Sequence, residues 1–175
     1  MQDGQARSEA IELPGLSLRL AGLDDYSTIR HVHASAIRSL AEGLLEIEDV
    51  ERSIKAIYSI PYVTELAEKR LYVALLNGEL VATCAWSPSD DRGQSARIGA
   101  LFVLPLFQGA GIATRLIERV EQDAAEHGYT AFTAIVPVSL APVVERLGYR
   151  TASFGTSRDV VPATALQVAF MRKPG

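Results

Sequence analysis

Hydrophobic and polar residues recur in the N-terminal part of the chain at spacings that predict a strand followed by helices. Residues 16–20 alternate apolar and polar side chains, as a half-buried strand does. Apolar residues at helical spacing then run from 29 to 41, after Asp24 or Asp25, which can cap a helix, and before Gly43, which can end it. A second helical pattern covers about residues 47–57, and a short helix is expected before residue 69.

The pattern then changes to apolar runs that are typical of strands. Residues 71–76 and 79–86 flank Asn77-Gly78, a dipeptide that favours a two-residue hairpin turn because both of its residues tolerate positive φ. The polar segment 87–94 predicts a flexible connection, and residues 97–104 predict a further strand. We therefore expect an antiparallel meander over this part of the chain.

A turn with two glycines joins the last of these strands to a long amphipathic helix. Pro105 stops the strand, Gly109 and Gly111 turn the chain, and apolar side chains then repeat on one helical face from Ile112 until Gly128. Glycine lets the backbone approach a ligand closely, and the first amides of a helix have no partner within it. Because the helix dipole also favours negative charge at this end, the turn can hold a pyrophosphate without a lysine.

Other structures share this glycine spacing. An ordinary tight turn between a strand and a helix needs the same residues. A dinucleotide-binding turn places its glycines directly after the strand and ends the next strand on an acidic residue, whereas here residues 105–108 intervene and the next strand ends Ile135-Val136-Pro137. A P-loop requires Gly-Lys-Ser/Thr, which the sequence lacks. Spacing alone leaves the ordinary turn and the phosphate-binding turn open.

The pattern after the long helix fixes the fold class. Residues 130–136 predict a strand that runs parallel to the strand before the glycine turn, because a helix joins the two. A short helix is expected over 139–147, with strands at 150–154 and 164–171. The chain is therefore expected to form a mixed α/β fold.

Composition narrows the setting of the protein. The 175 residues are 48% apolar, which suits one domain over residues 15–175 after a flexible segment over 1–14. The net charge of −4 comes from scattered charges without a basic tract, so no nucleic-acid or membrane partner is expected. Cys84 is the single cysteine, which excludes an internal disulfide and a cysteine-rich metal site and favours a core residue over a nucleophile. With no signal peptide and no long apolar run, we expect a cytoplasmic protein without a metal.

Two motifs give this order of elements a family resemblance. Gln108, Gly111 and Ala113 follow the spacing Gln-x-x-Gly-x-Ala, after Leu-Phe-Val-x-Pro at residues 101–105 and before Glu-Arg-Leu-Gly-Tyr at residues 145–149. In this combination the chain resembles the GCN5-related N-acetyltransferase (GNAT) superfamily over essentially its whole length. The resemblance implies a central, mostly antiparallel sheet with one parallel β-α-β unit and helices on both faces.

The resemblance also implies that acetyl coenzyme A is the co-substrate. Its pyrophosphate is expected on the turn amides, and its pantetheine arm along the preceding strand, where it can pair with free backbone groups as in β-augmentation. The donor-site residues that the resemblance implies are Leu101, Phe102, Val103, Gln108, Gly109, Ala110, Gly111, Ile112, Ala113 and Thr114.

Two positions depart from the family pattern for proton transfer. Val144 stands where many members carry a tyrosine that protonates the leaving thiolate, and Arg97 stands where many carry a glutamate base. The catalytic residues are therefore unknown, although the Val103 amide can still polarise the acetyl carbonyl and acid–base help is typically worth only about 10²–10⁴-fold. Arg97 itself can bind a substrate carboxylate or pair with Asp90 or Asp91.

Further candidates for the acceptor side are two histidines and the single tryptophan. His31 and His33 lie two apart on a predicted helix, so they cannot both line one pocket wall, and for each the favoured explanation is a surface or satisfied histidine. Trp86 can wall the acceptor pocket or serve as a core or rim aromatic.

We predict an acetyl-CoA-dependent N-acetyltransferase that acts on the amine of a small molecule or peptide by direct attack in a ternary complex, with room for a homodimer. The alternative is a catalytically silent acyl-CoA-binding or protein-interaction module, which Val144 and Arg97 favour. A pyridine-nucleotide enzyme is a further alternative.

Overall fold

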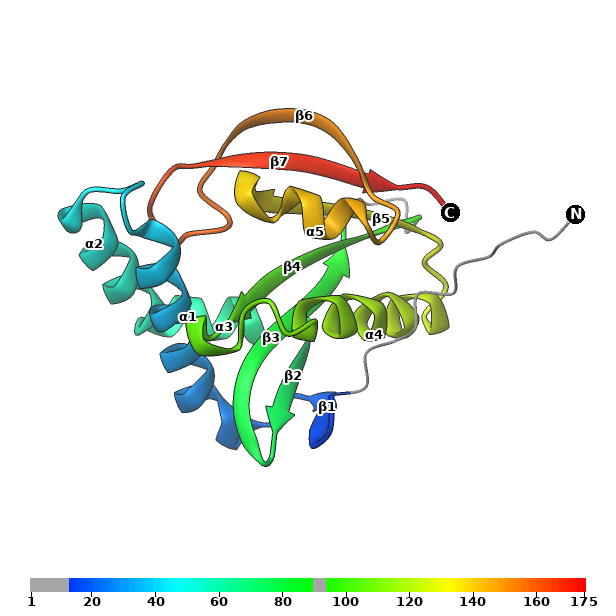
Figure 1. The fold of residues 1–175 in the computed structure, drawn as a ribbon, viewed down its shortest axis with the longest axis horizontal. Coiled ribbons are helices and arrows are strands. Elements are labelled where there is room, and N and C mark those ends of the chain that lie inside the picture. Colours follow the sequence, from blue (N-terminus) through cyan, green and yellow to red (C-terminus); the bar gives the residue numbers. More distant parts are fainter. Residues whose placement is uncertain (1–12, 90–93) are drawn as a thin grey trace, which may run out of the picture.

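The computed structural model describes residues 13–89 and 94–175. Its strands are β1 (Leu16–Leu20), β2 (Arg70–Leu76), β3 (Glu79–Pro88), β4 (Ser95–Val103), β5 (Ala131–Pro137), β6 (Arg150–Ser157) and β7 (Leu166–Lys173). They form one seven-stranded sheet in the order β1-β2-β3-β4-β5-β7-β6, in which β4 and β5 are parallel and the other neighbours are antiparallel (Figure 1). The predicted fold class is confirmed. The expected flexible segment 1–14 lies outside the described residues except for 13 and 14, and the expected connection 87–94 lies partly outside them.

Helices cover both faces of the sheet. They are α1 (Tyr26–Ala41), α2 (Ile47–Ile57), α3 (Ile60–Ala67), α4 (Ile112–Glu126) and α5 (Ala141–Glu145). Buried residues of α4 and α5 form a hydrophobic core with one face, and those of α1, α2 and α3 form a second core with the other. In Figure 1 α1, α2 and α3 gather at one end of the molecule, away from α5.

Local details differ from the sequence prediction in two places. Neither Asp24 nor Asp25 caps α1 through its side chain; the Asp25 carboxylate instead accepts hydrogen bonds from the Gly22 amide at 2.7 Å and from Arg19 at 2.6 Å. The expected helix over 139–147 is a 3₁₀-helix, η3 (Val138–Leu140), followed by the short α5. The hairpin prediction is confirmed, since Asn77 and Gly78 both have positive φ, of 51° and 83°.

A buried carboxylate ties α4 to the strands beneath it. Asp123 is 3% exposed and accepts hydrogen bonds from Arg70 at 2.8 and 2.9 Å and from the Trp86 indole at 2.7 Å. Burial alone would raise the pKa of Asp123, but the hydrogen bonds from Arg70, Trp86 and Tyr72 outweigh it and hold the pKa below its usual value. The carboxylate therefore fixes the Trp86 ring in the core between β3 and α4.

Replacing Asp123 by Asn should lower the free energy of unfolding by about 1–3 kcal/mol, because the pair with Arg70 is lost while Trp86 keeps an acceptor. Urea denaturation followed by the fluorescence of the single tryptophan measures the change. Glu126→Gln, at an exposed position of the same helix, is the control and should shift stability by less than about 0.5 kcal/mol. Equal losses in the two variants would contradict the assigned role of Asp123.

Candidate functional site

The turn before α4 presents unused backbone amides to solvent. Gly109 and Gly111 are exposed, with φ of 80° and 85°, and a Cβ built on either would meet no atom within 4 Å. Among the described residues, no backbone hydrogen bond uses the amides of Gly109, Ala110 or Gly111. The first amides of α4, from Ile112 on, also lack partners within the helix. The turn is thus an open cradle of donors at the positive end of a helix, the arrangement that binds phosphate groups.

The strand that leads into this turn has an open inner edge. Within the described residues, β4 pairs with β5 only over 95–98, although β4 continues to Val103. The Leu104 amide donates to Val81 of β3 at 2.9 Å, so alternation along the strand turns the backbone groups of Val103 toward β5. From that side the Gln108 side chain donates to the Val103 carbonyl at 3.4 Å. A ligand with amide groups can therefore reach free strand groups beside the glycine turn.

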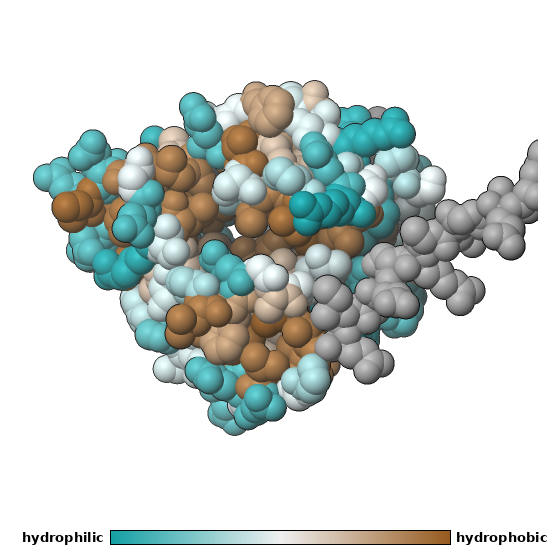
Figure 2. Space-filling view, viewed as in Figure 1, coloured by the Kyte–Doolittle hydropathy of each residue, from teal (hydrophilic) through white to brown (hydrophobic). Residues whose placement is uncertain are grey.

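A β-bulge bends β4 where the two strands part. Thr83 of β3 pairs with Phe102 and Ala85 pairs with Gly99, so that Ala100 and Leu101 together stand opposite one residue. Ala100 has a φ of 49°, and its carbonyl accepts a hydrogen bond from the Thr83 hydroxyl at 2.8 Å. Figure 1 shows β4 and β5 diverging beyond this point, and Figure 2 shows a hollow there that is ringed largely by apolar residues.

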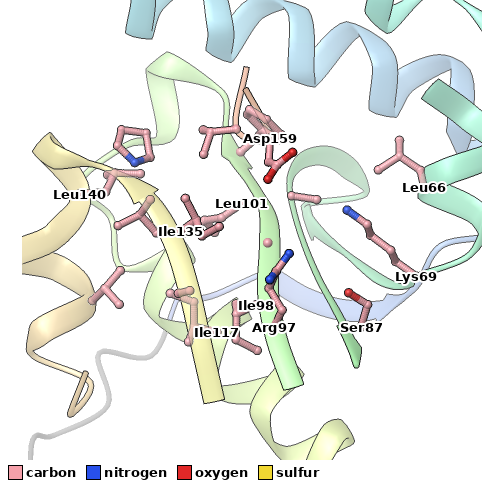
Figure 3. Close-up of a pocket in the computed structure, with 18 of the residues that line it drawn as sticks. Leu66, Lys69, Ser87, Arg97, Ile98, Leu101, Ile117, Ile135, Leu140 and Asp159 are labelled. Atoms are coloured by element: carbon pink, nitrogen blue, oxygen red, sulfur yellow. The ribbon is translucent and has the colours of Figure 1, made fainter. Parts of the chain in front are cut away.

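A cavity of about 310 Å³ occupies this space. One side is apolar and includes Ile117, Ile135, Leu140 and Val144. The polar part of its lining includes Tyr62, Glu65, Lys69, Arg97 and Asp159. Figure 3 shows the Lys69 and Arg97 side chains turned toward the same space in front of β4, with the Asp159 carboxylate facing it from the opposite side.

A chain of hydrogen bonds leads from the cavity to the bulge. His33 of α1 is fully buried, with Nδ1 2.5 Å from the Tyr62 hydroxyl and Nε2 2.7 Å from the Thr83 hydroxyl. Thr83 donates its proton to the Ala100 carbonyl, so its oxygen accepts from His33 Nε2–H, and His33 Nδ1 accepts from the Tyr62 O–H. Burial, with a smaller effect of the Lys69 charge, lowers the pKa of His33 to about 3 and keeps the ring neutral near neutral pH.

The structure brings the donor-site residues of the sequence prediction together along one path. Leu101 and Phe102 line the cavity, and Val103 follows them on the open edge of β4. The 3₁₀-helix η2 (Pro105–Phe107) then leads to the turn at residues 108–111 and to α4. Ile112 is 2% exposed, so only its backbone amide is available to a ligand.

The predicted acceptor-side residues are dispersed. Arg97 lines the cavity, whereas His31 is exposed on α1 and does not line it. His33 meets the cavity only through Tyr62, and the Trp86 ring is held against α4. The alternative pairing of Arg97 with residue 90 or 91 involves positions outside the described residues. Val144, 1% exposed, lines the apolar side with a side chain that carries no proton to transfer.

Sequence reasoning did not single out the polar residues that come from α3 and from the β6–β7 connection. Tyr62 and Glu65 lie three apart after Pro61, a spacing that places them on one side of α3, whereas Lys69 follows the end of that helix. Asp159 lies in a polar loop segment without such a signal. Its contribution to the cavity follows only from the tertiary fold.

Neither thiol nor metal chemistry is indicated among the described residues. Cys84 is fully buried, and burial raises the pKa of its thiol to about 12, so the thiolate is scarce near neutral pH. Within residues 13–89 and 94–175, no three His, Cys, Asp or Glu side chains gather as a metal site. In the same part of the chain, no helix combines the length and apolarity needed to cross a bilayer.

Solved structures share this fold. The GCN5-related N-acetyltransferase of Rhodopseudomonas palustris superposes with a TM-score of 0.79 at 19% identity, over 94% of this chain and 99% of that one. The PaiA N-acetyltransferase of Thermoplasma acidophilum, in complex with coenzyme A, gives a TM-score of 0.75 at 15% identity, over 91% and 99%. YncA of Salmonella typhimurium, with its cofactor acetyl-CoA, gives 0.63 at 18% identity, over 91% and 93%.

Sequence comparison gives the family. No curated protein matches the chain by sequence. The model of the acetyltransferase (GNAT) family matches residues 37–149, which is more than half of the chain and includes both motifs and the glycine turn. The chain therefore belongs to the acetyltransferase (GNAT) family.

Proposed function

We propose that the protein is an N-acetyltransferase that uses acetyl-CoA to acetylate the amine of a small molecule or peptide within a ternary complex. The observation that carries this proposal is the open inner edge of β4, which runs directly into the cradle of free amides at Gly109–Gly111. A cavity lies at the other end of that edge. One continuous surface thus offers a phosphate site, a strand edge and a pocket in that order.

The donor half of this surface fits the coenzyme by its chemistry. The amides of Gly109, Gly111 and the first turn of α4 would hold the pyrophosphate, and the missing Cβ atoms leave the room that it needs. The backbone of Val103 would pair with the pantetheine arm. Acetyl-CoA supplies an activated acetyl group as a thioester.

The acceptor half would act mainly by position. An amine on the polar side of the cavity would attack the acetyl carbonyl directly, with a backbone amide of β4 as the donor to the developing oxyanion. The Arg97 guanidinium has donors and no acceptor, so it offers no base, and the Val144 side chain offers no acid. Because a thiolate is a stable leaving group, the reaction class does not require either role.

The second candidate is an acyl-CoA-binding module without turnover. The observation that favours it is the placement of both departures, Arg97 and Val144, in the wall of the cavity itself. A module of this kind would need only the donor half of the surface. Membership of the acetyltransferase family, together with the coenzyme-bound relatives, supports the enzyme instead.

Incubation with acetyl-CoA and a panel of primary amines should release free coenzyme A in step with amine acetylation. A thiol reagent and mass spectrometry of the amines measure the two products independently. The only protein thiol, Cys84, is buried and adds little background. Binding of acetyl-CoA without product from any amine would favour the silent module, and absence of coenzyme binding would overturn both candidates.

Gly111→Glu should weaken acetyl-CoA binding by roughly 10–100-fold, because a carboxylate and its side chain would enter the space beside the turn amides. Isothermal titration calorimetry measures the affinity. Gly128→Glu is the matched control: Gly128 also has a positive φ, of 94°, and open space around it, but it lies at the other end of α4. A folded Gly111→Glu protein with unchanged affinity would remove the turn from the coenzyme site.

A further inference from the structure

A row of cationic and hydroxyl side chains crosses the sheet at the polar side of the cavity. Arg97 pairs with Ser87 of β3 on one side and with Thr133 of β5 on the other. Lys69 directly precedes β2, whose first residue, Arg70, pairs with Trp86, the neighbour of Ser87. Residues directly opposite one another share a face of the sheet. Ser87, Arg97 and Thr133 therefore lie side by side across three strands, and Lys69 lies near this row, just before β2.

This row has unused binding capacity. Within residues 13–89 and 94–175, neither Lys69 nor Arg97 forms an ion pair or a side-chain hydrogen bond, and both side chains are exposed. The Thr133 hydroxyl oxygen is buried and has no hydrogen-bond partner. Both cations line the cavity and are turned toward the same space (Figure 3). Two free cations beside the Ser87 hydroxyl, which also lines the cavity, match the chemistry of a carboxylate, which accepts several hydrogen bonds at once.

Two carboxylates line the same cavity, and one of them, Asp159, faces the cations from the opposite side (Figure 3). Glu65 of α3 and Asp159 of the β6–β7 connection both line it, and neither forms an ion pair with a described residue. The cavity thus holds two cations and two carboxylates, with no ion pair among these described residues, around a small volume. A ligand with both an anionic and a cationic end complements this arrangement better than a plain amine does.

We propose that the acceptor is an amine that also carries a carboxylate, bound by Lys69 and Arg97 while its amino group lies near the bulge of β4. The inference rests on the proposed acetyl transfer. The amine nitrogen bonds to the acetyl carbon and the carbon–sulfur bond breaks; of the two protons that the ammonium loses, one leaves on the thiol and the other goes to solvent. Arg97 and Ala100 stand about 10 Å apart along β4, and the arginine side chain spans part of that distance. A short acceptor therefore fits between the guanidinium group and the bulge.

The carboxylate can belong to a free amino acid or to a peptide. Arg172 of β7 pairs with Thr133 and continues the row, but it does not line the cavity. A free amino acid would not reach it, whereas an acidic peptide would.

The test compares amino acids with their carboxamides, which keep the shape and remove the negative charge. Carboxamides lose the ammonium proton more readily, so a preference for the acid cannot come from amine reactivity. We expect kcat/KM to be at least about tenfold higher for the acid, and Arg97→Gln and Lys69→Gln each to reduce that ratio by about tenfold. Arg172→Gln is the matched control. It should leave kcat/KM for free amino acids unchanged and lower kcat/KM for acidic peptides only.

Equal kcat/KM for acids and carboxamides would overturn the anionic acceptor while leaving acetyl transfer intact. An unchanged ratio in both the Arg97 and Lys69 variants would overturn their assignment. If no amine is turned over, the same acid and carboxamide pairs are titrated calorimetrically into the protein loaded with coenzyme A. Equal affinities in that measurement would also overturn the inference, whereas tighter binding of the acids would support it independently of turnover.

The buried hydrogen-bond chain carries a second, independent inference about Tyr62. Its hydroxyl proton is directed to His33 Nδ1, at 2.5 Å, and His33 is in turn fixed by Thr83. Tyr62 also lines the cavity, so the remaining lone pair of its oxygen is free to face a ligand there. We infer that Tyr62 accepts a hydrogen bond from the acceptor amine and orients the nitrogen lone pair toward the acetyl group, with His33 as a positioning residue behind it.

Tyr62→Phe, which keeps the ring, should lower kcat/KM for the amine by about tenfold and leave the affinity for acetyl-CoA unchanged. Tyr58→Phe, at an exposed tyrosine four positions earlier, is the control and should change neither quantity. His33→Gln should also lower kcat/KM. The decrease should lie more in kcat than in the KM for the amine. Unchanged kcat/KM in Tyr62→Phe, or unchanged amine affinity of the coenzyme-loaded variant where no turnover is seen, would overturn the inference.

Discussion

The hydrogen bonding of one strand governs the whole site: β4 is paired to β5 over 95–98 and then continues without that neighbour. Backbone N–H and C=O groups that lose a strand partner must find another one or stay in contact with solvent or a ligand. The bulge at Ala100 and Leu101 makes this separation possible, because the extra residue bends β4 away from the line of the sheet. The Thr83 hydroxyl, on the Ala100 carbonyl, holds the bend. The cavity and the open edge are consequences of the same distortion.

The two faces of the sheet support the two halves of the site differently. On one face, the buried side chains of Ile112, Leu116 and Ile117 anchor the start of α4, so the glycine turn is presented from a packed helix. On the other face, α1 holds His33 under the bulge and α3 carries Tyr62 to the cavity. The donor half is therefore built from backbone groups and the acceptor half from side chains. A backbone site constrains the sequence at few positions, chiefly where positive φ requires glycine, as at Gly109 and Gly111.

This division explains what the sequence could and could not predict. Turn residues report backbone geometry directly, which is why Asn77-Gly78 and the two glycines before α4 located the hairpin and the cradle. The polar row across the sheet depends on register. A regular two-residue hairpin at Asn77-Gly78 would pair Arg70 with Ala85, but an extra residue in β3, at the irregularity between Ala74 and Leu75, shifts the pairing by one. Arg70 therefore pairs with Trp86, and Lys69 precedes it on the side of Ser87. Because such a one-residue shift moves a side chain to the other face, no local pattern could have assigned Lys69 to the cavity.

The cations of the row also bear on the absence of a conventional base. An amine must lose a proton before it can attack, and a nearby positive charge disfavours its protonated form. Lys69 and Arg97 present two positive charges on the polar side of the cavity, where many family members would place the negative charge of a glutamate. Glu65 and Asp159 line the same cavity with two negative charges, so the net effect on the ammonium ion is set by where the nitrogen lies between the cations and the carboxylates. An amine held near Arg97 loses its proton more readily, whereas one held near Asp159 keeps it, and the position that the bound carboxylate gives the nitrogen decides between the two.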